Sequence, residues 1–207
     1  MHAALLPPHP MDVRDQLIHA ALQVYSQGGS RGATTRRIAE LAAVNEVTLF
    51  RHFGSKDALI SAALGWLAER ALALRLPEQP SNPRAELTAF CRAHHRGIYE
   101  NRALIRKTMA EFEEHPEGAA VAREITAGIE RELQGYLSRL RRAGRAGGRW
   151  RIGTATAMLM GTLFADAVGR DCMPERYPAS ADQAVAEYVE LFLRAVGATP
   201  ASRAISR

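Results

Sequence analysis

The stretch TTRRIAELAAVNEVTLFRHFGSK, residues 34–56, decides the fold of this chain. Thr34 or Thr35 suits the N-cap of a short helix, a turn follows at residues 43–45, and a second helix then runs to Phe53. Apolar side chains fall where two crossing helices bury one another, at Ile38, Ala39, Ala42, Val44, Leu49 and Phe53. The side chains left to face outward are Arg36, Arg37, Glu46, Val47, Thr48, Arg51 and His52. The pattern predicts a helix-turn-helix, and the alternative is an ordinary helical hairpin whose outward residues are simply solvated.

The composition of the whole chain favours an all-α protein. Its 207 residues are 47% hydrophobic, enough to bury a full core, and aromatic residues and runs of β-branched residues are few. Cys91 and Cys172 lie far apart without the spacing of a metal site, so we expect two reduced thiols. No stretch reaches 18 uninterrupted apolar residues, and residues 1–10 lack the features of a signal peptide. We therefore expect a cytoplasmic protein with no membrane span and a mobile tail over residues 1–10.

Net charge alone does not identify a nucleic-acid partner. The chain carries a formal charge of +5, yet residues 1–60 hold six Lys or Arg against five Asp or Glu, which leaves only +1 there. DNA binding by this region must therefore depend on where the cations lie. A second cationic stretch, residues 139–151, fits either a further nucleic-acid patch or a flexible solvated loop at a helix end.

The N-terminal part of the chain, which contains the predicted helix-turn-helix, resembles the TetR family of transcriptional regulators. Members carry the pattern TT..IA..AGVS.GTLY.HF.SK.AL near the N-terminus, and this chain is similar to it over residues 11–64. The corresponding residues are Thr34, Thr35, Ile38, Ala39, Val44, Thr48, Leu49, Phe50, His52, Phe53, Ser55, Lys56, Asp57, Ala58 and Leu59. The resemblance implies an all-α protein of about nine helices. A three-helix DNA-binding domain is expected over residues 11–57, and a helical ligand-binding and dimerisation domain over residues 58–207.

The resemblance also implies where DNA is contacted. Thr35, His52 and Lys56 stand at positions that contact phosphates in the family. Arg36 stands where some members use an arginine to reach a guanine edge, which a forked guanidinium binds through two hydrogen bonds. Glu46 suits a cytosine amino group, although a carboxylate repels phosphates. The full set of predicted contact residues is Thr35, Arg36, Asn45, Glu46, Val47, Thr48, Phe50, Arg51, His52 and Lys56.

Four residues depart from the family pattern. Ala43 stands where the turn usually has glycine, which calls the positive φ of that turn into question. Asn45 replaces a serine and still caps a helix well. Val47 replaces a glycine, so either the helix lies farther from the bases or the Val47 methyl groups touch a thymine methyl group. Phe50 replaces a tyrosine, and its ring can pack but cannot donate a hydrogen bond to a phosphate.

Two helices are expected to flank the helix-turn-helix. The first covers residues 12–27 and is ended by Gly28 and Gly29. The second, over residues 55–74, connects the two domains. Three prolines then mark a linker, at Pro77, Pro80 and Pro83.

The C-terminal domain is expected to bind a small apolar molecule among its helices. Candidate lining residues, each with core packing as the alternative, are Phe90, His94, Met109, Phe112, Met158 and Phe164. His94 lies on an apolar stripe, where a histidine is more often a core residue than a ligand contact. Glu111 and His115 are four residues apart and, with His94 or His95, come nearest to a metal site. Without a second paired motif we expect no metal and no cofactor.

The last two helices have the features of a dimer interface. Gly153, Ala157, Gly161 and Ala165 recur every four residues, so one helix has a smooth ridge that another helix can approach closely. The apolar stripe expected to meet this ridge is made by Val185, Tyr188, Val189 and Phe192. Paired across a two-fold axis, these helices would form a four-helix bundle, and the alternative is packing within one chain.

These features favour a homodimeric, ligand-responsive transcriptional repressor. One helix-turn-helix reads few base pairs, so two copies are expected about 34 Å apart on a near-palindromic operator in double-stranded DNA. The resemblance implies release from DNA when a small-molecule effector binds the C-terminal domain. The alternatives are an activator, and a helical ligand-binding or protein-binding module that has lost DNA affinity. The sequence contains no nucleophile elbow, phosphate-binding loop or catalytic carboxylate pair, so we do not expect an enzyme.

Overall fold

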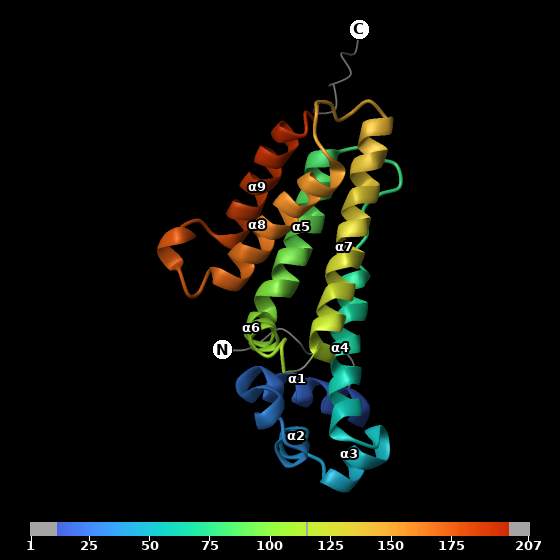
Figure 1. Cartoon of the computed structure of the whole chain (residues 1–207), viewed down its shortest axis with the longest axis vertical. Helices are drawn as coiled ribbons and strands as arrows, with labels where there is room; N and C mark the ends of the chain where they lie inside the picture. Colours follow the sequence, from blue (N-terminus) through green and yellow to red (C-terminus); the bar gives the residue numbers. More distant parts are fainter. Residues whose placement is uncertain (1–11, 115, 199–207) are drawn as a thin grey trace. The chain divides into compact units, whose positions relative to one another are not determined.

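The computed structural model describes residues 12–114 and 116–198. Over these ranges the chain forms nine α-helices and one short 3₁₀ helix, η1, without any strand (Figure 1). The predicted all-α class is confirmed, while the predicted tail over residues 1–10 lies outside the described residues. The helices are α1 (Val13–Gly32), α2 (Thr35–Leu41), α3 (Glu46–Phe53), α4 (Lys56–Leu72), α5 (Pro83–Glu100), α6 (Arg102–Ala110), α7 (Pro116–Arg142), α8 (Ile152–Gly169), η1 (Pro174–Arg176) and α9 (Ala181–Ala195).

The described chain forms two compact units, and neither is one continuous segment. Unit 1 contains the residues up to Glu69 together with Ala103–Val121. Unit 2 contains Arg70–Arg102 and the residues from Ala122 onward. The chain therefore passes from one unit to the other within α4, at the beginning of α6 and within α7.

The core of unit 1 is small and apolar. Leu17, Ile38, Leu49 and Leu59 come from α1, α2, α3 and α4 in turn, and each is completely buried. Burial of one such side chain is worth about 1.5–3 kcal/mol relative to exposure, so this cluster fixes the helix-turn-helix against its neighbours. Leu104 of α6 belongs to the same cluster, although it comes much later in the sequence.

Side-chain caps determine where the short helices begin. Thr34 Oγ1 accepts a hydrogen bond from the amide of Arg37 at 3.3 Å, so Thr34 rather than Thr35 is the N-cap of α2. Asn45 Oδ1 accepts from the amide of Thr48 at 2.8 Å and caps α3. Each cap satisfies an amide that has no partner inside its helix, which is typically worth about 1 kcal/mol.

Two backbone features differ from the sequence-based expectations. Ala43 has a φ of 55°, so the turn keeps the left-handed conformation despite the missing glycine. The helix predicted to stop at Gly28 and Gly29 is instead interrupted at Gly29, with φ 65° and ψ −165°, and resumes to Gly32. Only glycine enters that region of φ and ψ without strain, so α1 bends there rather than ending.

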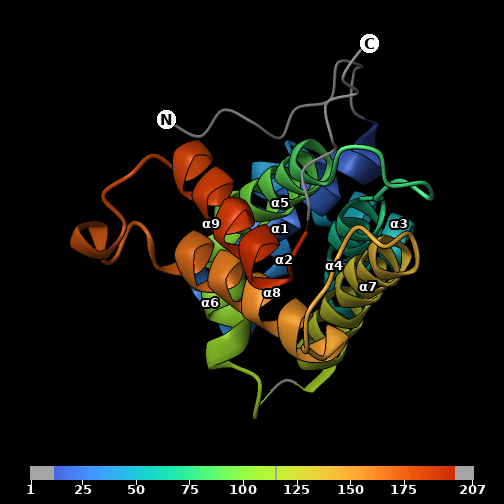
Figure 2. The same cartoon turned by 90° about the horizontal axis from the view of Figure 1, so that it is seen from above.

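Unit 2 is a helical bundle in which α5, α8 and α9 pack against one another, and they lie side by side in both views (Figures 1 and 2). α7 contributes Leu133, Tyr136, Leu137 and Leu140 to the same core, each completely buried. By length and composition alone α8 would fit a membrane span, and 44% of it is buried within the structure. A core helix passes the same test, and α8 occupies such a place in unit 2.

Candidate nucleic-acid interface

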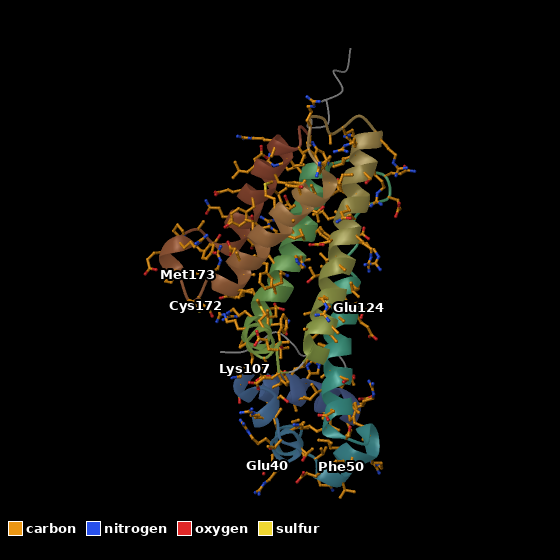
Figure 3. All side chains as sticks on the ribbon, in the orientation of Figure 1. Glu40, Phe50, Lys107, Glu124, Cys172 and Met173 are labelled. Atoms are coloured by element: carbon orange, nitrogen blue, oxygen red, sulfur yellow. The ribbon has the colours of Figure 1, made fainter. Side chains whose placement is uncertain are left out.

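The outer face of α3 combines apolar and cationic side chains. Val47 is 75% exposed and Phe50 47% exposed, and Arg51 and His52 are exposed beside them. Residues 47, 50 and 51 share one side of the helix, whereas Leu49 is buried in the core of unit 1. Figure 3 labels Phe50 on α3. A helix anchored on one side and exposed on the other has the form that enters a major groove.

The two arginines of α2 have different surroundings. Arg36 Nε lies 2.9 Å from Glu40 Oε1, one turn further along, and both side chains are exposed. The hydrogen bond to Glu40 and its charge raise the pKa of Arg36, which remains a cation. An exposed pair of this kind is weak, so Arg36 is available to another anion. Arg37 instead donates to the carbonyl of Gly32 at 3.1 Å and to Gln27 Oε1 at 3.3 Å, which ties α2 to the end of α1.

Two predicted contact residues are bonded to each other. Thr35 Oγ1 donates to Glu46 Oε2 at 2.5 Å, which joins the first turn of α2 to the first turn of α3. One carboxylate oxygen of Glu46 is therefore occupied before any DNA arrives. The hydroxyl of Thr48 is also engaged, since it donates to Asn45 Oδ1 at 2.9 Å. These bonds hold the helix-turn-helix in shape.

Lys56, predicted to contact a phosphate, has a partner within unit 1. Its Nζ donates to the carbonyl oxygen of Ser30 at 3.2 Å. The amide of Ser30 donates to Glu111 Oε2 at 3.2 Å, and the hydroxyl of Tyr25 donates to the same oxygen at 3.0 Å. Sequence reasoning missed this role of Glu111, because 81 residues separate it from Ser30 and no local pattern links them.

All ten predicted DNA contacts lie in unit 1, and they differ in exposure. The exposed residues are Arg36, Asn45, Val47, Phe50, Arg51 and His52. The partly buried residues are Thr35, Glu46, Thr48 and Lys56. Arg36 and Asn45 of the exposed set, and all four of the partly buried residues, already have a hydrogen-bond partner in the protein.

The predicted pocket residues divide between the two units. Phe90 is buried in the core of unit 2, whereas Met158 of α8 is 50% exposed. Met109, which is 46% exposed, and Phe112 belong to unit 1. The remaining two, His94 and Phe164, are partly buried in unit 2. Met109 and Met158 are each about half exposed, because they fall outside the buried stripes of α6 and α8. That these six residues line a ligand pocket stays a prediction.

A surface hollow of about 560 Å³ lies over α8, η1 and α9. Its lining is formed by Met158, Gly161, Thr162, Ala165, Arg176, Tyr177 and Tyr188. It shares only Met158 with the predicted pocket.

A buried ionic network in unit 2 escaped the sequence analysis. Asp166 of α8 has no exposed surface, and it accepts hydrogen bonds from Arg170 at 2.8 and 2.7 Å and from the Tyr188 hydroxyl at 2.7 Å. His95 Nε2 lies 2.9 Å from the same carboxylate. Burial by itself would raise the pKa of Asp166, but the bonds to Arg170, His95 and Tyr188 lower it, so the group is ionised. An acid inside an apolar helix, followed four residues later by an arginine, is the signal that could have identified this pair.

His95 is the more deeply buried histidine of α5, while His94 beside it is partly buried. His95 is 3% exposed and its ring is parallel to that of Tyr99, with centroids 6.4 Å apart. Burial and the neighbouring His95 lower the pKa of His94 to about 4, so His94 is neutral at pH 7. The apolar stripe predicted for this helix is thus shifted by one residue at this point.

The metal site considered from the sequence and the buried cysteine Cys91 are further candidate functional groups. In the part of the chain that the structure describes, no three potential metal ligands lie together, and His115 is outside that part. Glu111 is instead bonded to Tyr25 and Ser30. Burial raises the pKa of Cys91 to about 12, so it remains a thiol at neutral pH.

The ridge of small residues predicted on α8 is on the surface. Gly153, Ala157, Gly161 and Ala165 are all exposed. A Cβ atom added at Gly153 or Gly161 would meet nothing within 4 Å. Around Gly153 and Gly161 this side of α8 is therefore open to close approach by another helix, whereas at Ala165 the hydroxyl of Tyr177 donates to the backbone carbonyl at 3.1 Å.

The apolar stripe predicted on α9 does not face outward. Val185, Val189 and Phe192 are at most 2% exposed and belong to the core of unit 2, and Tyr188 is bonded to Asp166. The alternative of packing within one chain describes this stripe, because α9 uses its apolar side to close its own bundle. Leu191, 63% exposed, is the large apolar residue that α9 leaves on the surface.

The N-terminal helices of this chain are similar in sequence to known regulatory proteins. Residues 17–63 match the sequence model of a family described as bacterial regulatory proteins, tetR family. The transcriptional regulator UidR of Escherichia coli K12 is 31% identical over 109 residues, which cover 52% of this chain and 56% of UidR. The transcriptional repressor Rv3405c of Mycobacterium tuberculosis is 31% identical over 77 residues, which cover 37% of this chain and 41% of that protein. The chain therefore spans about half the length of the curated relatives it matches.

Solved structures extend the likeness to most of the chain. GusR of Salmonella enterica has a TM-score of 0.70 at 22% identity, over 91% of this chain and 97% of GusR. The fatty acid degradation regulator FadR of Bacillus halodurans has a TM-score of 0.66 at 20% identity, over 89% and 96%. At such identities the likeness concerns the fold, and it confirms an N-terminal helix-turn-helix followed by a C-terminal helical domain.

Proposed function

Because this chain belongs to the tetR family of bacterial regulatory proteins, we propose that it represses transcription by binding operator DNA as a homodimer. The operator in this proposal is near-palindromic, so that two copies of α3 enter successive major grooves about 34 Å apart. A small apolar effector binds the C-terminal helical domain and releases the protein from DNA. The protein acts in the cytoplasm and carries out no catalysis.

The outer face of α3 is the observation that carries this proposal. Val47 and Phe50 offer apolar contact to thymine methyl groups and sugars, and Arg51 and His52 offer donors to phosphates. Arg36 on α2 adds a guanidinium whose Nε pairs with the exposed Glu40. The face thus combines one set of groups suited to base edges with another suited to the backbone.

The exposed ridge of α8 supports the homodimer. Its small residues allow two helices to approach closely, and Leu191 of α9 supplies an apolar contact. The ridge of one protomer would meet the same ridge of its partner across a two-fold axis. A dimer is needed because a single short recognition helix contacts too few base pairs to select one site.

The continuity of α4 supports the coupling of effector and operator. One uninterrupted helix, Lys56–Leu72, begins next to α3 in the sequence and ends in unit 2. An effector that binds one conformation of the C-terminal domain better than another shifts the population of DNA-competent dimers, typically by about 1–3 kcal/mol of coupling. Phe90, His94, Met158 and Phe164 are the candidate lining residues in unit 2.

The test is an anisotropy titration of labelled promoter DNA flanking the protein's own gene, at two salt concentrations. Arg36→Ala with Arg51→Ala should abolish the preference for this DNA over random duplex. It should also lower the salt dependence by about 0.9 in log–log slope for each phosphate contact removed. The matched control, Arg149→Ala with Arg151→Ala, removes the same charge from exposed positions of unit 2 and should retain the preference. Equal losses in both variants would mean that binding follows bulk charge.

A second candidate function is a helical module without DNA affinity. The observation in its favour is the pair Val47 and Phe50, which place large apolar groups where the family pattern has glycine and a tyrosine hydroxyl. Wild-type binding no tighter to any genomic fragment than to random duplex would support this candidate. An activator differs from a repressor only in operator position, so a reporter assay distinguishes those two.

A further inference from the structure

Glu111 follows α6 in the sequence, but its carboxylate bonds to α1. The hydroxyl of Tyr25, a residue only 5% exposed, donates to Glu111 Oε2 at 3.0 Å. The backbone amide of Ser30 donates to the same oxygen at 3.2 Å. Ser30 follows the interruption of α1, so its amide has lost the partner that an unbroken helix would provide. Glu111 therefore caps the second part of α1 from a distant part of the chain.

Gly29 is the residue that lets Glu111 approach so closely. Its φ of 65° and ψ of −165° lie in a region that other residues avoid. A Cβ atom at this position would lie 1.9 Å from Glu111 Oε1 and 2.9 Å from Cε of Lys107, which Figure 3 labels on α6. The absence of a Cβ atom at residue 29 thus leaves the space that the Glu111 carboxylate occupies.

Ser30 connects Glu111 to Lys56, which is a predicted DNA contact. While its amide is held by Glu111, its carbonyl oxygen accepts a hydrogen bond from Lys56 Nζ at 3.2 Å. Lys56 is the first residue of α4 and follows the last residues of the helix-turn-helix. One residue of α1 therefore links a carboxylate after α6 to an ammonium group beside the recognition helix.

We propose that Glu111 is a positioning residue for DNA binding, which holds Ser30 and thereby places Lys56 for a phosphate contact. The proposal rests on the proposed function, and it extends the DNA-binding machinery to a residue outside the helix-turn-helix. In this arrangement the ammonium group of Lys56 is oriented before DNA arrives, so less of its side-chain freedom is lost on binding.

The direction in which DNA affinity changes when Glu111 is removed distinguishes a positioning role from a simple charge effect. A carboxylate near DNA repels phosphates, so its removal by charge alone should tighten binding. Glu114 provides the matched control, since it lies three residues away and its carboxylate pairs with Arg31 at 3.5 Å, with both side chains well exposed. Glu111→Ala should weaken binding to the promoter fragment about tenfold, whereas Glu114→Ala should leave it unchanged or tighter.

The experiment measures binding of the full-length protein to promoter DNA and to random duplex of equal length. The variants are Glu111→Ala, Glu111→Gln, Glu114→Ala, Lys56→Ala and the double variant Glu111→Ala with Lys56→Ala. If Glu111 acts through Lys56, the double variant should bind about as weakly as Lys56→Ala alone. Both bonds go to the same oxygen, so the amide oxygen in Glu111→Gln can accept both of them, but as an uncharged and weaker acceptor. This variant should therefore fall between Glu111→Ala and the wild type. Additive losses, or equal binding by Glu111→Ala and Glu114→Ala, would overturn the proposal.

Hydrogen exchange at the Ser30 amide, followed by NMR without DNA, tests the contact itself. Exchange should accelerate in Glu111→Ala and stay unchanged in Glu114→Ala, and equal exchange in both variants would overturn the proposal. A wild-type protein with a slow Ser30 amide but no preference for any promoter DNA would overturn the proposed function, and the positioning role with it. Weaker promoter binding by the Glu111 and Lys56 variants, with Glu114→Ala unchanged or tighter and the wild type preferring promoter DNA, would support both.

Discussion

Ala43 occupies a left-handed turn position that glycine would adopt without strain. Its φ of 55° lies in the left-handed region, which costs a residue with a Cβ atom roughly 1–2 kcal/mol. The turn persists because the caps on both sides and the buried residues of α2 and α3 determine it together. The sequence identified the missing glycine correctly, but it could not show that the surrounding contacts would outweigh the strain.

Ala43→Gly should therefore stabilise the protein. The relief of left-handed strain exceeds the added entropy of glycine in the unfolded chain, so we expect a gain of about 0.5–1 kcal/mol in the free energy of unfolding. Urea denaturation measures it. The control is Ala42→Gly, at a buried position with φ −79°, which should destabilise the protein. A loss of stability in both variants would show that Ala43 is not strained.

Gly29 presents the opposite situation, since the native residue is the one that fits. Gly29→Ala should cost about 1–3 kcal/mol for the backbone, and the clash with Glu111 adds to this. The neighbouring Gly28→Ala is the control, because its Cβ would meet only an ordinary contact at 3.5 Å and alanine favours a helix. Thermal unfolding of the two variants should shift in opposite directions. Similar shifts would mean that the bend at Gly29 imposes no special requirement.

At the scale of elements, the sequence predicted helices better than it predicted which faces they bury. The helix-turn-helix followed from local signals, namely caps, apolar spacing and the family pattern. The partners of α8 and α9 did not, because Asp166 and His95 are 71 residues apart and a stripe looks the same whether it meets its own bundle or a partner. Val185, Val189 and Phe192 illustrate the second difficulty.

The beginning of α5 gives a pH-dependent prediction. Partial burial would raise the pKa of Glu86, but hydrogen bonds from Asn82, Tyr136 and Ser81 lower it to about 2. Because the folded-state pKa lies below the unfolded value of about 4.3, Glu86 stabilises the fold above pH 4.3. That contribution is lost as the pH falls from there toward 2.

Urea unfolding of the wild type and Glu86→Gln at several pH values measures this contribution. The difference in the free energy of unfolding should be largest near pH 6 and shrink progressively below about pH 4.3. Glu100→Gln, an exposed carboxylate at the other end of α5, is the control and should show little difference at any pH. A constant difference for Glu86→Gln would contradict the role of its ionised form.

For the whole molecule, the exposed ridge of α8 gives the sharpest test of assembly. The Cβ atom added in Gly161→Glu would meet nothing within 4 Å and Gly161 is exposed, so the protomer should fold normally. Across a two-fold axis the same glutamate would meet its copy, and sedimentation velocity should show a monomer. Gly97→Glu, also exposed on a helix with nothing within 4 Å, should leave the dimer intact. A dimeric Gly161→Glu protein would place the interface elsewhere.

The discontinuity of unit 1 affects the order in which the protein can mature on the ribosome. Leu104 and Glu111 complete this unit, so the N-terminal helices lack those partners until residues 103–121 have been translated. At ~5–20 residues per second, the synthesis from residue 57 to residue 121 takes on the order of several seconds. A transcript broken before codon 103 yields a fragment without these residues. Under the proposed function, such fragments should compete little with the intact protein for operator DNA, so premature termination would remove activity without creating an inhibitor.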